Sequence, residues 1–233
     1  MTRFIGAYLG PMFADQNVNA EIFLGSLSED GGGGKARAIM SAVMADAPAM
    51  SYVKGFGFEW DGTRLVAEVK PSGLPIWQDN HNVGNLPWAG GSFRPDAAPN
   101  DHAYAVTSWG FIRDWIRAGV NTYFTSSMIL DSVGVGIGSM AWPQNALLVV
   151  DASSNVLVTP AYHLFRHLSP YVDPGAQVIG TTGGDALAFK NPDGTIVAVL
   201  YNSGAARTTI VAMAGKKLKF DMPANGWATV KTK

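Results

Sequence analysis

The chain of 233 residues contains no cysteine, which excludes disulfide bonds and thiolate metal ligands. Charged residues make up only 15% of it, and the formal net charge is −1. A chain with this balance has no general attraction to nucleic acids or anionic membranes, so neither is expected as a partner. No apolar run reaches the roughly 18 residues that a membrane span requires. The start, MTRFIGAYLG, is too mixed for a signal peptide, so the localisation stays open.

Apolar residues are plentiful, at 47% of the sequence. This content predicts a compact globular protein. The length suits one large domain or two modest ones with a sizeable core.

The first part of the chain alternates between two kinds of apolar pattern. Short segments that are apolar on both faces predict parallel β-strands at 20–25, 54–60, 74–80 and 121–127. Segments with a period near 3.6 residues predict helices at 4–13, 35–46, 102–119 and 162–169. Thr159 and Pro160 provide a start for the last of these helices.

The helix predicted at 102–119 has the clearest signals. Its apolar face contains Ala105, Trp109, Ile112 and Ile116. Asn100 or Asp101 can cap its start, and Gly119 suits its end.

The pattern changes after Pro170. Residues 186–201 predict two strands joined by an Asn-Pro-Asp-Gly turn. Residues 216–223 alternate between apolar and polar side chains, which predicts a strand with one solvated face. We therefore predict an α/β fold of four βα units over 1–169, followed by a small antiparallel β domain over 170–233.

Four βα units raise a structural question. A closed eight-stranded barrel needs about 250 residues and twice as many units. Four strands alone would leave two edges and an apolar inner face exposed. The sequence therefore predicts that a missing part completes the sheet.

Seven segments of the chain resemble segments of glycoside hydrolase family 30 in the family's order. These are FIGAYLGPMF, AEIFLGSL, VKGFGFEWDG, PIWQDNHNVGNLPW, WPQNALLVVD, YHLFRHLSPYVDPGAQ and LAFKNPDGTIVAVLYN. The family contains glucosylceramidases, β-glucosidases, β-xylosidases and endo-β-1,6-glucanases. The resemblance implies a TIM barrel with a β-sandwich, and retaining hydrolysis of β-glycosides. It also implies that this chain is the C-terminal half, with barrel strands five to eight, and that the half with the acid/base Glu is absent.

The resemblance places the family's catalytic nucleophile at Asn80. The family's seventh strand ends Trp-Gln-Thr-Glu-His with a Gly-Asn pair shortly after, and residues 77–81 here read Trp-Gln-Asp-Asn-His, followed by Gly84 and Asn85. An amide is neutral and a poor nucleophile, so the substitution predicts impaired catalysis. Asp79, which replaces the Thr, could act only if the loop were rearranged, because neighbouring strand residues face opposite ways.

Other departures from the family pattern concern the ends of the neighbouring strands. Ser126 and Ser127 stand where the family often has an aromatic residue and an Asn. Glu59 replaces the usual Gln or His before Trp60. Glu59 could bind sugar hydroxyls while Trp60 stacks on the ring, or the two could be a solvated Glu and a wall Trp. His81, at a strand end, is a candidate substrate contact, or it orients the loop.

Further candidates lie along the chain. Trp77, Trp88 and Trp142 are either sugar-stacking or core residues, and Gln144 and Asn145 either line the site or hold their loop. His163 and His167 have the spacing of a metal pair, but no third ligand is near in sequence, so we interpret them as structural. Neither a metal nor a cofactor is expected.

Three functions remain open at this point. The first is a carbohydrate-related barrel half that is catalytically impaired. The second is an active β-glycosidase formed by self-pairing or with a separate N-terminal half, in which Glu59 and Asp79 could form a new carboxylate pair. The third is a non-catalytic interaction module. Because the open inner face would be apolar, we predict a homodimer or a missing barrel half as partner.

Overall fold

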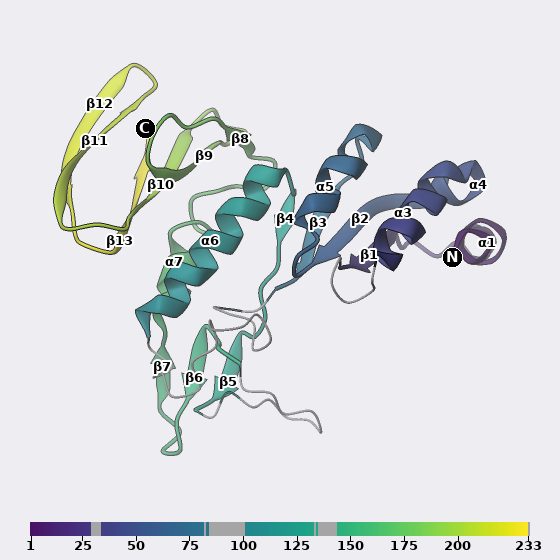
Figure 1. Ribbon diagram of the computed structural model, residues 1–233, viewed down its shortest axis with the longest axis horizontal. Coiled ribbons are helices and arrows are strands. Elements are labelled where there is room, and N and C mark those ends of the chain that lie inside the picture. Colours follow the sequence, from purple (N-terminus) through teal and green to yellow (C-terminus); the bar gives the residue numbers. More distant parts are fainter. Residues whose placement is uncertain (29–33, 82, 84–100, 133, 135–143, 233) are drawn as a thin grey trace. The chain divides into compact units, whose positions relative to one another are not determined.

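A computed structural model describes residues 1–28, 34–81, 83, 101–132, 134 and 144–232 (Figure 1). The chain divides into two compact units. The first unit contains residues 1–82 and 114–126, and the second contains 83–113 and 127–233. This division does not test the domain boundary expected near residue 169, which stays a prediction.

The first unit is built on a four-stranded parallel sheet. Its strands are β1 (Ile22–Leu27), β2 (Val53–Glu59), β3 (Ile76–Asn80) and β4 (Thr122–Tyr123), in the spatial order β1-β2-β3-β4. The four predicted strands are thus present and parallel. β4 is shorter than predicted, although Phe124 and Ser126 still donate backbone hydrogen bonds to the carbonyls of Gln78 and His81.

One face of this sheet belongs to the core of the first unit. Alternate side chains of the strands are buried, namely Leu24, Phe56, Phe58, Ile76 and Gln78. The helices α3 (Lys35–Ala45) and α5 (Thr63–Val69) bury Ala36, Met40, Val43, Leu65, Val66 and Val69. The short α4 (Ala47–Met50) and a 3₁₀ turn, η3 (Lys70–Ser72), complete the connections.

A helical segment precedes β1. It consists of α1 (Thr2–Phe4), the π-helical turn η1 (Ile5–Leu9) and α2 (Gly10–Asp15). Two glycines let this segment approach α4 and Tyr52, which lies two residues after α4. A Cβ on Gly6 would lie 3.0 Å from the backbone nitrogen of Ala49, and one on Gly10 would overlap the ring of Tyr52. The segment was predicted as one helix over 4–13, and the structure extends it at both ends.

The long helix α6 (His102–Ala118) runs from the second unit into the first. Asp101 accepts the backbone N–H of Ala103 at 2.8 Å and so caps the start, as predicted for one of two candidates. The other candidate, Asn100, lies outside the described residues. Gly119 follows the helix with a φ of +113°, which suits glycine.

A small three-stranded sheet in the second unit was not predicted. It contains β5 (Ile129–Asp131), β6 (Leu148–Val150) and β7 (Val156–Val158), with β5 parallel and β7 antiparallel to β6. Helix α7 (Pro160–Arg166) follows, and the side chain of Thr159 caps it as expected.

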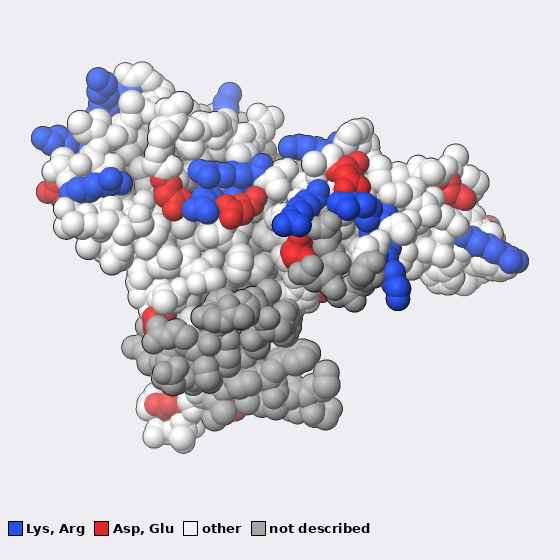
Figure 2. Space-filling view, viewed as in Figure 1, with Lys and Arg blue, Asp and Glu red and all other residues white. Residues whose placement is uncertain are grey.

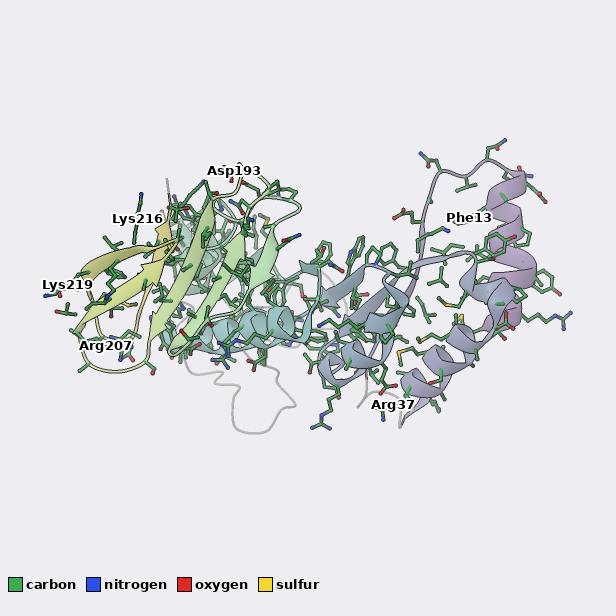
Figure 3. The ribbon with its side chains drawn as sticks, turned by 90° about the horizontal axis from the view of Figure 1, so that it is seen from above. Phe13, Arg37, Asp193, Arg207, Lys216 and Lys219 are labelled. Atoms are coloured by element: carbon green, nitrogen blue, oxygen red, sulfur yellow. The ribbon has the colours of Figure 1, made fainter. Side chains whose placement is uncertain are left out.

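The C-terminal part forms antiparallel sheets, as predicted. The strands β8 (Gln177–Ile179), β9 (Asp185–Lys190), β10 (Ile196–Asn202) and β13 (Gly226–Lys231) have the order β13-β10-β9-β8. A separate hairpin joins β11 (Arg207–Met213) and β12 (Lys216–Met222). Arg207, Lys216 and Lys219 point outward from this hairpin (Figure 3). The predicted alternation in β12 is observed only toward its end, where Phe220 is half-buried and Met222 buried, while Leu218 is exposed like the lysines.

No helix in the described part of the chain is long and apolar enough to cross a membrane.

Candidate functional site

The candidate site lies where β2 and β3 end, side by side, in the first unit. Glu59 is the last residue of β2 and Asn80 the last residue of β3, and the two are directly paired in the sheet. The Asn80 side-chain nitrogen Nδ2 donates a hydrogen bond of 3.0 Å to Glu59 Oε2. The strand register shifts between Phe58 and Glu59, so β3 has one extra residue there, Asp79.

Two glycines make room for the side chain of Asp79. A Cβ added to Gly57 would overlap Asp79 Oδ2, and one added to Gly25 would lie 2.9 Å from the same oxygen. The carboxyl group therefore lies across the backbones of β2 and β1. There it accepts a hydrogen bond from the side chain of Ser26.

The surroundings of Asp79 favour its protonated form. Burial raises the pKa of this carboxyl group, and the negative charge of Glu59 raises it further, while the hydrogen bond from Ser26 partly offsets both. Its second oxygen, Oδ1, is buried and has no hydrogen-bond partner in the described part of the structure. Oδ1 is thus an acceptor, or in the protonated form a proton donor, that no described group satisfies.

Three aromatic rings lie on the same face of the sheet as Asp79, on the side toward the start of β3. The rings of Phe23 and Trp77 lie 4.1 Å apart, and those of Trp77 and Phe124 lie 5.8 Å apart. Trp77 is partly exposed and 47% of Phe124 is exposed. The opposite face of the same strands is buried, so this face is the accessible one.

Trp60 and His81 follow the two strand ends. Trp60 has a left-handed backbone with φ +51°, and its N–H donates to the Asn80 carbonyl at 3.3 Å. Such a conformation is unfavourable for a bulky residue and is often found at functional sites. The His81 ring is 1% exposed, lies 5.7 Å from the Trp60 ring and stacks on Tyr123. Burial raises the pKa of the Tyr123 hydroxyl group, which therefore stays neutral.

The remaining predicted site residues lie elsewhere or are not described. Gln144 and Asn145 belong to the second unit, where Gln144 donates its backbone N–H to Gly134 and Asn145 forms a bridge with Val83. Trp142, together with Trp88 and the Gly84-Asn85 pair, lies outside the described residues.

The His163–His167 pair shows a structural contact. His167 Nδ1 lies 2.9 Å from the Thr229 hydroxyl oxygen, and that hydroxyl donates to the His167 carbonyl, so Nδ1 is the donor. Within the described ranges no group of three residues could hold a metal ion.

Reasoning from the sequence missed the residues that hold and flank Asp79. Ser26, Gly25 and Gly57 place its carboxyl group, and Phe23 and Phe124 flank Trp77. One signal was present, because glycine at alternate positions of β2 indicates a strand face that a neighbouring side chain must cross.

The fold and one domain match known glycoside hydrolases. Residues 175–230 match the model of the glycosyl hydrolase family 30 beta sandwich domain. The whole chain resembles SrfJ from Salmonella typhimurium, with a TM-score of 0.80, 21% identity and coverage of 100% of this chain and 52% of that one. The endo-β1,6-glucanase BT3312 has a TM-score of 0.74 and 19% identity, with coverage of 99% of this chain and 52% of that one.

A third structure agrees. The catalytic domain of GH30 xylanase C from Talaromyces cellulolyticus has a TM-score of 0.64 and 17% identity, with coverage of 96% of this chain and 55% of that one. No curated protein matches this sequence. The resemblance to glycoside hydrolase family 30 is therefore confirmed, and the chain spans about half the length of the solved structures it matches.

Proposed function

We propose that this chain is a carbohydrate-binding half of a TIM barrel, with barrel strands five to eight and a β-sandwich, and that it is catalytically impaired. The observation that carries this proposal is the hydrogen bond from Asn80 Nδ2 to Glu59 Oε2. The bond supports the proposal because it engages the amide of Asn80, the residue at which the resemblance to the family puts the nucleophile.

The chemistry of retention supports impairment. A retaining glycosidase needs two carboxyl groups about 5–5.5 Å apart, one that attacks the sugar and one that donates a proton. The Asn80 amide cannot attack, because it is neutral and its nitrogen is engaged with Glu59. Asp79 lies across β1 and β2 and is held by Ser26, so it does not replace the missing group directly.

Sugar binding is supported by the kind of side chains at the site. Aromatic faces stack on the apolar side of sugar rings, and carboxylates and amides accept or donate hydrogen bonds to hydroxyl groups. The first unit offers Trp60, Trp77, Glu59 and Asp79. His81 is buried against Trp60 and Tyr123, so we propose that it orients the strand ends, the second of the two roles expected for it. The roles expected for Gln144, Asn145 and Trp142 stay predictions from the sequence, because the first two residues belong to the second unit and Trp142 lies outside the described residues.

One observation favours a second candidate function, an active β-glycosidase that forms when a partner completes the barrel. Asp79 has a raised pKa next to the negative charge of Glu59. A carboxyl group with a raised pKa is suited to donate a proton as a general acid. In that case Asp79 would be the acid.

Binding and turnover measured on the same sample separate these functions. The names of the matched structures suggest β-1,6-linked gluco-oligosaccharides and xylo-oligosaccharides as ligands to test. Isothermal titration calorimetry measures their binding to the chain. Aryl β-glycosides report hydrolysis through the released phenol. We expect saturable binding without turnover, and weaker binding by Trp77→Ala but not by Phe220→Ala, a control in the β-hairpin. Turnover that depends on Asp79 would favour the active enzyme, and neither binding nor turnover would leave an interaction module.

A further inference from the structure

We propose that the site at the ends of β2 and β3 selects an amino sugar, that is, a sugar that carries a protonated amino group. Glu59 and Asp79 would attract the ammonium group, and Trp77 would stack on the sugar. This inference rests on the function proposed above, because it names the class of sugar that the same site would bind.

Two carboxyl groups meet at these strand ends. Glu59 is the last residue of β2, and Asp79 is the extra residue of β3 at the register shift beside it. Burial is the main cause of the raised pKa of Asp79, and the negative charge of Glu59 raises it further, so the two groups are close enough to act on each other. An opposite charge placed near both would relieve their repulsion and favour the ionised form of Asp79.

The groups around this pair supply no such charge. Glu59 Oε2 accepts its hydrogen bond from the neutral amide of Asn80. The groups that act on the Asp79 carboxyl are the Ser26 hydroxyl, the backbone and Glu59, and none of them is a cation. The other oxygen, Asp79 Oδ1, is buried and has no partner among the described residues. A ligand with a positive charge would supply what this part of the chain lacks.

Charges elsewhere on the first unit are balanced in a different way. Arg37 Nε lies 2.8 Å from Glu68 Oε1, an exposed pair that joins α3 to α5. Figure 2 shows acidic and basic side chains interspersed on the face it displays. The pairing of a carboxylate with an amide and a second carboxyl group is therefore a local feature of the strand ends.

The aromatic rings on the same face suit a cation that is attached to a sugar. Trp77 precedes Asp79 by two residues in β3, is partly exposed and contacts the rings of Phe23 and Phe124. The face of an aromatic ring attracts an ammonium group and also stacks on the apolar side of a sugar. An amino sugar offers both groups in one molecule. A metal ion would use neither the ring nor the amide, and the described residues hold no cluster of three metal ligands.

The place of the two carboxyl groups leaves them within reach of a ligand. They lie at the carboxyl ends of parallel strands, the end at which barrel sites open. Glu59 and Asp79 are each partly exposed. A ligand cation need not touch the buried Oδ1 of Asp79, because an opposite charge within about 4–6 Å is enough to favour the carboxylate.

Three matched probes test the inference on the full chain. Aryl β-glycosides of glucosamine, glucose and glucuronic acid carry a positive charge, no charge and a negative charge on similar rings. Isothermal titration calorimetry at about pH 6, where an amino group is protonated, measures their binding. We expect the glucosaminide to bind about fivefold more tightly than the glucoside, and the glucuronide to bind more weakly than either.

Variants show whether the two carboxyl groups cause this preference. Glu59→Gln and Asp79→Asn should each bring the ratio of glucosaminide to glucoside affinity toward one. The ratio compares two ligands on the same sample, so a partial loss of folded protein does not change it. Glu21→Gln is the matched control, because it removes the same charge from an exposed residue just before β1, at the opposite end of the sheet. It should leave the ratio unchanged.

The pH gives an independent reading. The ratio should fall as pH is lowered toward about 4, because Asp79, whose pKa is raised, takes up a proton and loses its attraction for the ammonium group. Equal binding of the three probes, or tighter binding of the glucuronide, would overturn the inference and leave the sugar-binding function standing. A preference that survives in both Glu59→Gln and Asp79→Asn would also overturn it. Binding of none of the probes would overturn the sugar-binding function as well.

Discussion

The carboxyl group of Asp79 links the geometry of the site to stability. Its pKa is raised in the folded chain, first by burial and then by Glu59. The folded state therefore binds the proton more tightly than the unfolded state does. Stability should fall as pH rises from about 4 through the raised pKa, because the folded state must then hold a poorly solvated charge.

We therefore expect Asp79→Asn to stabilise the chain at pH 7 and to have little effect near pH 4. The expected gain is a few tenths of a kcal/mol, because the side chain is only partly buried and solvent screens its charge. Urea unfolding at both pH values measures it. Asp151→Asn is the control, and it should destabilise the chain at pH 7. Hydrogen bonds from Asn155 lower the pKa of the Asp151 carboxyl group, so its ionised form stabilises the fold. A destabilised Asp79→Asn at pH 7 would contradict the burial argument.

At the scale of elements, one contact ties helix α6 to strand β9 inside the second unit. Asp185 accepts a hydrogen bond of 2.9 Å from the Trp109 indole nitrogen and two more, also of 2.9 Å, from Arg113 Nη1. Trp109 is almost fully buried. Loss of the acceptor would therefore leave a buried N–H without a partner.

Asp185→Ala should lower the free energy of unfolding by about 1–3 kcal/mol, because a buried donor and a partly buried guanidinium lose their partner. Asp185→Asn should cost less, since its carbonyl oxygen can still accept from Trp109. Chemical denaturation with fluorescence detection measures both. Asp221→Ala removes an exposed contact with Thr208 and should stay within about 0.5 kcal/mol. If Asp185→Ala has as small an effect as this control, the tie contributes little.

The elements also show what a sequence can and cannot predict. The strands of the parallel sheet follow from their apolar runs, and α6 follows from its period, its Asp101 cap and Gly119. The sheet of β5, β6 and β7 was missed because three-residue strands leave no periodic pattern.

The site shows the same limit. The sequence located Asn80 and Glu59 at strand ends, but their hydrogen bond joins residues 21 positions apart. The position of Asp79 depends on a register shift, which is not visible in the local sequence. It also depends on Gly57 of another strand, and the alternate glycines of β2 show that a side chain crosses there without showing which one. Contacts set by strand pairing must be seen in the structure.

At the scale of the whole molecule, the β-sandwich depends on the helices before it. One face of β9 and β10 buries Leu187, Phe189, Val197, Val199 and Tyr201. Helices α6 and α7 reach this sheet through contacts of the His102 ring with Trp227 and of His167 with Thr229. Residues 170–233 are therefore a region of the fold whose core includes earlier parts of the chain.

A fragment of residues 170–233 should not fold by itself. Exposing five large apolar side chains would cost on the order of 10 kcal/mol, at about 2 kcal/mol each. A domain of about 60 residues rarely has more than about 3–5 kcal/mol of stability to lose. We expect no cooperative thermal transition for this fragment, and a cooperative one for the full chain and for residues 101–233, which keep α6 and α7. Circular dichroism measures all three. A cooperative transition of 170–233 alone would instead establish an independent domain that begins at the boundary predicted from the sequence.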